Sequence, residues 1–203
     1  MGELHANMHV TLDGVITANG GPTAQDGWFR YAGWENPYGD ADSGEVLMAD
    51  VERADALLLG RVTYDIFRGY WPGRTDRIGT AFDAAPKYVV SRGDAELSWE
   101  GTTLLQDAAA VADARARHRE IQTWGSGALL QTLLREGLVD QLNLWVAPVV
   151  LGEGAHLFPT GTPAETFALA EAPRAFPGGS LLLRYRALRT PPPTVPEDAP
   201  IPR

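Results

Sequence analysis

Short apolar runs alternate with helix-like segments over most of the chain, and this alternation is the feature that most narrows the possible folds. The run DALLLG at 55–60 is followed at once by RVTYDIFRGYW, and EIQTW at 120–124 is followed by ALLQTLLREG, whose leucines fall on one helical face. Strands separated by helices predict a mostly parallel sheet covered on both sides. Further strands are expected at 4–14, 87–92, 102–106, 141–152, 166–176 and 180–188, and further helices at 43–54 and 107–118.

The ends of these segments carry their own signals. Ser43 is a plausible N-cap, Asp107 stands near the start of its helix, and Gly137 closes the leucine-rich helix. The last strands follow one another without helices, so we expect them to add an antiparallel edge to the sheet. Residues 1–189 are therefore predicted to form one α/β domain of three layers, and 190–203, with six prolines, a disordered tail.

Composition excludes several classes of protein. The chain has no cysteine, which excludes disulfides and thiol chemistry, and its net charge of −9 argues against a nucleic-acid or anionic-membrane binder. No signal peptide and no membrane-spanning run are visible, so we expect a cytoplasmic protein. His5 and His9 stand too far apart along one strand to share a metal ion, and no metal site is predicted.

An aromatic-rich loop at 17–42 is expected to have a function, because long loops in compact domains seldom lack one. Its Trp28 and Trp34 could cover a flat heterocyclic substrate by stacking, although an apolar cluster beneath the loop would explain them equally well. Tyr64 could line the same pocket or pack in the core. Asp13, at the end of the first strand, is a candidate for catalysis and substrate binding, or a residue that only forms an Asp-Gly turn.

Three strand ends carry residues that suit a phosphorylated ligand. Gly60-Arg61-Val62-Thr63 and Gly125-Ser126-Gly127 each join a strand to a helix, and Ser91-Arg92 closes a third strand. Helix N-termini present free N–H groups to anions, glycine lets an oxygen approach the backbone, and arginine binds a phosphate monoester through two hydrogen bonds. Each junction alone could be a plain turn. The Walker pattern is absent, and Leu130 stands where the Rossmann fingerprint needs its third glycine.

The order of TLDGVI, ALLLGRVTYDIF, PKYVVSR and WGSGALLQTLLREGLVDQLNLWVAPVVLGEG resembles the dihydrofolate-reductase-like family. The closer resemblance is to the branch that holds the RibD C-terminal domain, the reductase domain of riboflavin biosynthesis. It implies that NADPH is the cofactor and that its phosphates lie at two glycine turns, with Ser91 and Arg92 at the 2′-phosphate. The residues that it places in these turns are Gly60, Arg61, Thr63, Gly125, Ser126, Gly127, Ala128 and Leu129.

The resemblance also implies an activity, the reduction of a dihydrofolate-like or 5-amino-6-(5-phosphoribosylamino)uracil-like substrate. In folate reductases a carboxylate stands near the start of the helix before the first glycine turn, where this chain offers Asp42 or Glu45. The alternative is a non-catalytic ligand-binding module of the same fold. Relatives commonly pair, and the apolar run from Trp145 to Leu151 is long for one sheet edge, so a homodimer is predicted.

Overall fold

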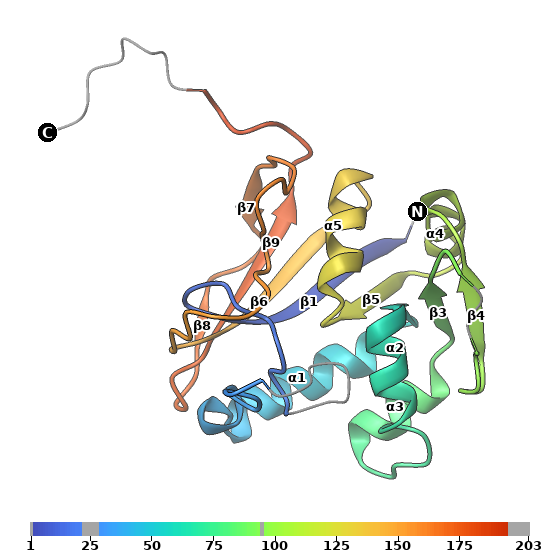
Figure 1. Ribbon diagram of the computed structural model, residues 1–203, viewed down its shortest axis with the longest axis horizontal. Coiled ribbons are helices and arrows are strands. Elements are labelled where there is room, and N and C mark those ends of the chain that lie inside the picture. Colours follow the sequence, from blue (N-terminus) through green and yellow to red (C-terminus); the bar gives the residue numbers. More distant parts are fainter. Residues whose placement is uncertain (1, 22–28, 94–95, 195–203) are drawn as a thin grey trace, which may run out of the picture.

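A computed structural model describes residues 2–21, 29–93 and 96–194. They form one twisted nine-stranded sheet with the strand order β4-β3-β2-β5-β1-β6-β9-β7, and β8 also pairs with β9 (Figure 1). The pairs from β4 to β6 are all parallel, and β9 runs antiparallel to β6, β7 and β8. The predicted parallel sheet with an antiparallel edge is thus confirmed. The strands are β1 (Glu3–Thr11), β2 (Ala56–Gly60), β3 (Lys87–Val90), β4 (Thr102–Leu105), β5 (Glu120–Trp124), β6 (Gln141–Ala147), β7 (Phe167–Leu169), β8 (Arg174–Ala175) and β9 (Leu181–Ala187).

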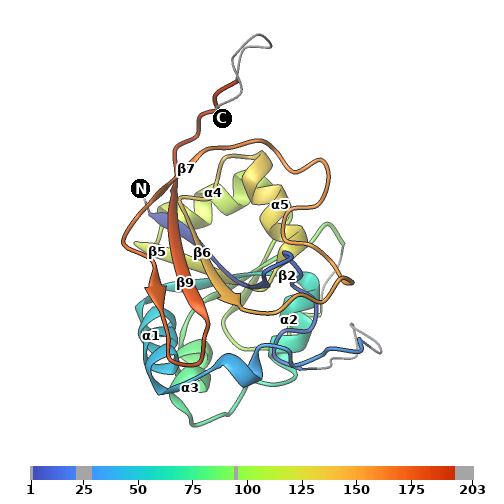
Figure 2. The same cartoon turned by 90° about the vertical axis from the view of Figure 1, so that its left-hand side faces the viewer.

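Helices cover both faces of this sheet, which gives the expected three layers (Figures 1 and 2). Side chains of α4 (Ala108–Ala116) and α5 (Gly127–Arg135) pack on one face, and those of α1 (Ala41–Arg53), α2 (Arg61–Arg68) and α3 (Arg77–Ala84) pack on the other. A short 3₁₀ helix, η1 (Asn36–Tyr38), precedes α1. No helix in the described ranges has both the length and the apolar character needed to cross a membrane.

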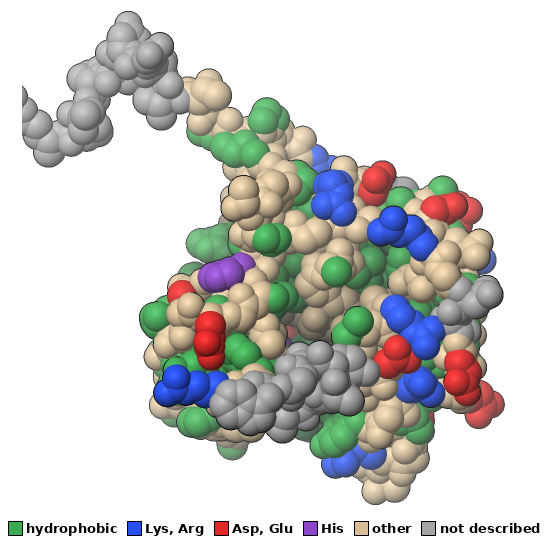
Figure 3. Space-filling model, in the orientation of Figure 1, with side chains coloured by type: hydrophobic (Ala, Val, Ile, Leu, Met, Phe, Trp, Pro, Cys, Tyr) green, Lys and Arg blue, Asp and Glu red, His purple; other side chains and the backbone are tan. Residues whose placement is uncertain are grey.

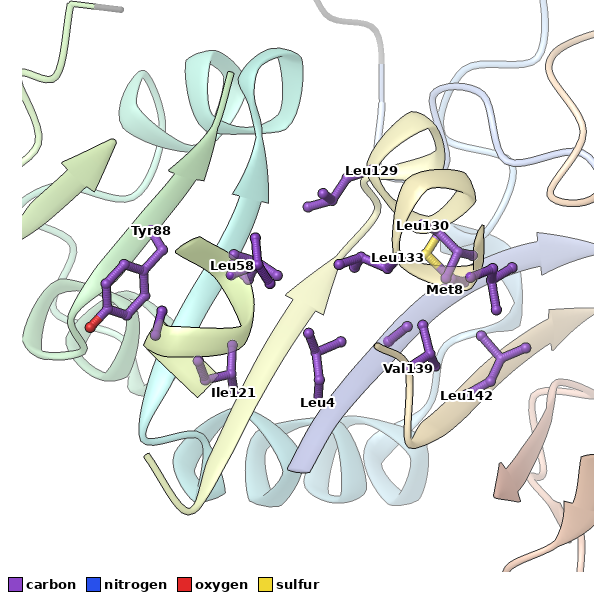
Figure 4. Close-up of a cluster of buried hydrophobic side chains, with 14 of the residues drawn as sticks. Leu4, Met8, Leu58, Tyr88, Ile121, Leu129, Leu130, Leu133, Val139 and Leu142 are labelled. Carbon is purple, nitrogen blue, oxygen red and sulfur yellow. The ribbon is translucent and has the colours of Figure 1, made fainter. Parts of the chain in front are cut away.

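The leucine-rich helix α5 is the centre of the first core. Leu129, Leu130, Leu133 and Leu134 are all buried, as their spacing predicts, and they lie over the side chains of Leu4 and Met8 from β1 (Figure 4). Burying a leucine fully contributes about 1.5–3 kcal/mol. This contact therefore fixes α5, and with it the glycine turn that starts it, above the carboxyl ends of β5 and β1.

Several predicted boundaries were wrong. Ser43 is not the N-cap of α1: Asp40 is, and Ser43 completes a capping box three residues later. The first strand ends at Thr11 rather than at the Asp-Gly turn, and the run at 141–152 is a strand only as far as Ala147. Helix α3 was missed because Gly79 and Thr80 are poor helix formers; Asp76 caps it and Phe82 anchors it in the core.

On the face that points toward α1, the central strands carry polar side chains. Parallel strands usually carry apolar side chains on both faces. Leu4, Ala6, Met8 and Val10 of β1 point toward the α4–α5 layer, and the alternate residues of the strand point the other way. There Asn7 bonds to Gln122 and Asn143 on the neighbouring strands. A network of this kind specifies how α1 docks, because each buried polar group needs its partner.

Ion pairs extend the same network to both sides of α1. Asp50 of α1 accepts from Arg184 of β9 at 2.8 Å, and Arg53 bonds Glu120 of β5 at 3.0 Å. Glu120 also lies 3.3 Å from the Nδ1 of His5. Both ends of α1 are therefore fixed, one by these pairs and the other by the Asp40 cap.

Two expectations concern surfaces. In the apolar run on which the predicted homodimer rests, Trp145 is 6% exposed and Val150 is 66% exposed, and the homodimer stays a prediction. The predicted tail at 190–203 lies partly outside the described residues; at its start, Thr190 still accepts a hydrogen bond from the backbone of Thr166.

Candidate functional site

The three predicted junctions lie side by side at one edge of the sheet. They follow β3, β2 and β5, which are consecutive parallel strands, so their carboxyl ends point the same way. Gly60 pairs with Val90 in register, which sets Ser91 beside the β2–α2 turn. The Ser126 hydroxyl accepts from the Gly60 backbone N–H at 3.0 Å and ties the two glycine turns together. Tertiary structure thus brings together segments that the sequence keeps 66 residues apart.

Helices α2 and α5 differ from the other α-helices of the described residues in how they begin. Aspartate side chains cap α1, α3 and α4, at Asp40, Asp76 and Asp107. Helices α2 and α5 have no side-chain cap, because Gly60 has no side chain and the Ser126 hydroxyl is turned to Gly60. The first N–H group of α5, that of Gly127, donates to the Gly125 carbonyl at 3.1 Å. The N–H groups that follow it, and those of the first turn of α2, have no side-chain cap, and the positive ends of both helix dipoles lie at the same place.

Different features of the β5–α5 turn favour glycine at positions 125 and 127. Gly125 is exposed with φ of +66°, a left-handed conformation that other residues adopt at a cost, and a Cβ there would meet no atom within 4 Å. A Cβ on Gly127 would lie 2.5 Å from the Cδ1 of Ile16. Packing against Ile16 therefore accounts for Gly127 without any ligand, which the sequence could not show.

The remaining predicted cofactor residues contribute in different ways. Ala128 is exposed at the second position of α5, whereas Thr63 and Leu129 are buried, so only their backbone N–H groups could meet a ligand. Arg61 is half-exposed and pairs with Asp65 at 2.8 Å, and Arg92 is exposed beyond β3. Figure 3 shows Lys and Arg side chains on the part of this face that carries α2, β3 and β4.

Next to the junctions, beyond the end of β1, lies a cavity of about 470 Å³. Its walls come from β1, β6, η1 and the start of α1, and include Trp34, as predicted for a substrate-covering residue. Tyr64 does not reach it: its ring is fully buried in the α2–α3 core, and its hydroxyl accepts from the Trp99 backbone at 3.0 Å. Trp28 lies outside the described residues.

A histidine and a glutamate meet at the wall of this cavity. The Nδ1 of His9 is 2.7 Å from a carboxylate oxygen of Glu35, and the imidazole stacks on Trp145 with ring centroids 5.8 Å apart. Burial raises the pKa of Glu35, but the charge and hydrogen bond of His9 outweigh it and hold this pKa below its usual value. Glu35 is therefore a carboxylate at neutral pH.

Asp13 lies in the turn after β1, where side-chain and backbone donors surround its carboxylate. Its carboxylate accepts from the Thr11 hydroxyl at 2.5 Å and from the backbone N–H groups of Leu151 and Gly152 at 3.1 and 2.7 Å. The hydroxyl bond and then the Gly152 bond lower its pKa. A carboxylate that is ionised and occupied in this way is a poor proton donor, and it holds the segment after β6 against the turn after β1.

The carboxylate expected at the start of α1 was also placed wrongly. Asp42 and Glu45 do not line the cavity, and Glu45 pairs with Arg77 on α3 instead. The acidic side chains that do line it are Glu35 and the N-cap Asp40. We did not predict His9 or Glu35 from the sequence. The one signal for His9 was that it is a polar residue on the strand face opposite Met8 and Val10. Within the described ranges, no three His, Asp or Glu side chains converge as a metal ion would need.

Strand β1 connects the cavity with the β5–α5 turn. The Gly125 backbone N–H donates to the Asn7 carbonyl of β1 at 3.2 Å, and His9 lies two residues further along that strand. Strands are about 4.8 Å apart, so the distance from β3 to β1 is about 14 Å.

Comparisons with known proteins agree with this architecture. Residues 3–175 match the family model described as the RibD C-terminal domain. The Bacillus subtilis (strain 168) protein YyaP is 27% identical over 159 residues, which cover 75% of this chain and 78% of that protein. The riboflavin biosynthesis protein RibD of Corynebacterium ammoniagenes is 30% identical over 160 residues, which cover 72% of this chain but 44% of that protein. This chain thus matches less than half of the length of that RibD.

Solved structures share the fold. A Shewanella sp. PV-4 protein named for riboflavin biosynthesis has a TM-score of 0.71 at 21% identity, with 92% of this chain and 99% of that chain covered. A pyrimidine reductase-like protein of Corynebacterium diphtheriae has a TM-score of 0.66 at 17% identity, with 93% of each chain covered. At such identities the likeness establishes the α/β architecture.

Proposed function

Because this chain belongs to the RibD C-terminal domain family, we propose that it is an NADPH-dependent reductase of a small heterocyclic substrate of the pterin, pyrimidine or riboflavin-precursor type. The observation that carries the proposal is the pair of uncapped helix N-termini at adjacent glycine turns. Three other helices use an aspartate for the same N–H groups, and an aspartate at α2 or α5 would repel a phosphate. The donor set therefore fits a pyrophosphate.

The residues around these turns have distinct roles in this proposal. The first N–H groups of α2 and α5 bind the pyrophosphate, Gly125 opens the approach, and Ser126 holds the two turns together. Arg92, with Ser91 beside it, would bind the 2′-phosphate that distinguishes NADPH from NADH. When bound, NADPH would supply the hydride.

The cavity would hold the acceptor. The aromatic rings of Trp34 and Trp145 suit a flat ring, and the charged groups of its described wall are His9, Glu35 and Asp40, with no Lys or Arg among them. Such a wall favours a neutral or cationic ring over a phosphate ester. We therefore expect acceptors without a phosphate group to be reduced in preference to their phosphorylated counterparts.

The test is a titration of NADPH and NADH against wild-type protein and Arg92→Ala, with Arg117→Ala as the matched control. Arg117 is an exposed arginine after α4, at the opposite edge of the sheet. Loss of one charge-assisted contact, worth roughly 1.5–3 kcal/mol, should weaken NADPH about ten- to a hundredfold and leave NADH unchanged. Equal weakening of both cofactors would remove Arg92 from the 2′-phosphate site.

Turnover is then measured as NADPH oxidation with dihydropterins, aminopyrimidines and quinones. Oxidation that depends on one of these acceptors supports the reductase. NADPH binding without oxidation by any of them would favour a ligand-binding module that keeps the fold.

A further inference from the structure

His9 occupies an unusual position for a strand residue of a parallel sheet. It pairs in register with Trp145 of β6, and its ring lies between the rings of Trp145 and Trp124, with centroids 5.8 and 6.4 Å away. The strand passes the Gly125 turn at Asn7, so His9 stands between the proposed phosphate site and the interior of the cavity.

Glu35 is the charged group next to this imidazole. Two other titratable groups line the same cavity, Tyr38 of η1 and Asp40 at the start of α1. Asp40 accepts from the backbone N–H groups of Ser43 and Gly178 at 2.8 and 2.6 Å, so its carboxylate is already occupied. Trp145 and Trp124, from β6 and β5, present uncharged rings. Glu35 is therefore the carboxylate that can position the His9 ring.

The pair lies at the cavity wall and is partly exposed there. The side chains of His9 and Glu35 keep 21% and 26% of their exposure, although both lie at the cavity wall. Beside them the Nε1–H of Trp145 is buried and has no acceptor within the described part of the chain. A buried donor of this kind calls for an explanation, and an acceptor atom on a ligand would satisfy it.

We propose that His9 is the proton donor to the acceptor bound in this cavity, and that Glu35 is the positioning residue that holds its imidazole in place. The proposal rests on the reductase function proposed above. In the reaction the C=N or C=O double bond of the acceptor gains a hydride at carbon, from the reduced dinucleotide, and a proton at nitrogen or oxygen. The proton comes from Nε2 of the imidazolium, since Nδ1 faces Glu35. The products are the reduced substrate, the oxidised dinucleotide and a neutral His9, which regains a proton from solvent.

The first test needs no turnover. The chain has four histidines, so the full-length protein labelled at histidine gives a countable set of imidazole signals, and the signal lost in His9→Gln identifies His9. Glu35→Gln removes the carboxylate that lies 2.7 Å from Nδ1 and should therefore shift the His9 signals. Unchanged signals would show that Glu35 does not contact His9, and would overturn the proposed pair.

The second test measures NADPH oxidation with 7,8-dihydropterin as the C=N probe and a simple aromatic aldehyde as the C=O probe. His9→Gln should lower kcat about 10²-fold, the usual scale for a positioned proton donor, and change the Kd for NADPH less than threefold. The decrease of kcat at high pH should disappear in His9→Gln. Glu35→Gln should lower kcat less than His9→Gln does, and should also change the Kd for NADPH less than threefold.

The outcomes separate this proposal from the proposed function. A wild-type protein that oxidises NADPH with neither probe nor any member of the larger panel would refute the reductase and the proton donor together. Turnover that persists in His9→Gln with the wild-type pH profile refutes the proton donor alone. Partial recovery of a His9→Ala variant by added imidazole, in proportion to the imidazolium concentration, would support it, because an altered fold would not respond in this way.

Discussion

The sharpest test of the phosphate site is a single negative charge at Ala128. This residue is exposed at the second position of α5, whose first N–H groups have no side-chain cap. A carboxylate there stabilises the helix by about 0.3–1 kcal/mol through its dipole, but it would repel a phosphate bound to the same N–H groups. Ala128→Asp should therefore affect stability and binding in opposite directions.

The size of the effect follows from the distances. A carboxylate at this position lies within about 4–6 Å of a phosphate bound at the helix end, where two unit charges interact by about 1 kcal/mol in water and about 4 kcal/mol at an effective dielectric constant of 20. Because Ala128 is exposed, we expect the lower part of this range, about 1–2 kcal/mol. NADPH and NADH should then both bind roughly 5- to 30-fold more weakly. Added salt should reduce the difference from wild type.

The structure offers a matched control at Ala109. It is exposed at the second position of α4, a helix of the same length that Asp107 already caps. Ala109→Asp should leave both dissociation constants unchanged, and Ala128→Asn separates the effect of charge from that of size. Dissociation constants from fluorescence titration and Tm values from thermal unfolding provide the data. If Ala128→Asp bound NADPH as wild type does, or if both aspartates weakened it equally, the α5 terminus would not be the phosphate site.

Three further predictions follow from other parts of the structure. Asp13→Asn should leave kcat within a few-fold of wild type and lower Tm, because the side chain holds Leu151 and Gly152; a hundredfold loss of kcat with normal stability would restore its catalytic role. Burial raises the pKa of Glu120, but bonds from His5 and Gln122 and the nearby Arg53 lower it from 4.5 to about 2. Its contribution to stability, on the order of 3 kcal/mol, is thus present above pH 4.5 and lost as the pH falls toward 2. Urea unfolding of wild type and Glu120→Gln at pH 7 and pH 3 should show this loss in wild type only. Removal of 195–203 should leave Tm within about 2 °C, whereas a larger decrease would show that the segment docks.

The sequence by itself determined the layered architecture and placed the three strand-end junctions next to one another. Apolar runs typical of buried strands are followed at once by leucines with helical spacing. This pattern predicts a parallel sheet between layers of helices. The carboxyl ends of parallel strands lie at one edge, so Gly60, Ser91 and Gly125 had to be neighbours once their strands were adjacent. These inferences needed only local patterns and one topological rule.

Tertiary structure decided everything that depends on which distant side chains meet. Ile16 occupies the space that Gly127 leaves, and Tyr64 turns into the core. The sequence could not show either, because it gives the type of a residue and not its neighbours.

The roles of the carboxylates were decided in the same way. Asp13 is occupied by two backbone N–H groups more than 130 residues away, and Glu35 meets His9 only because the loop before α1 folds back over β1. A carboxylate becomes a cap, an ion pair or a proton-transfer partner according to the donors that surround it. Those donors come from strands and loops that only the folded chain brings together.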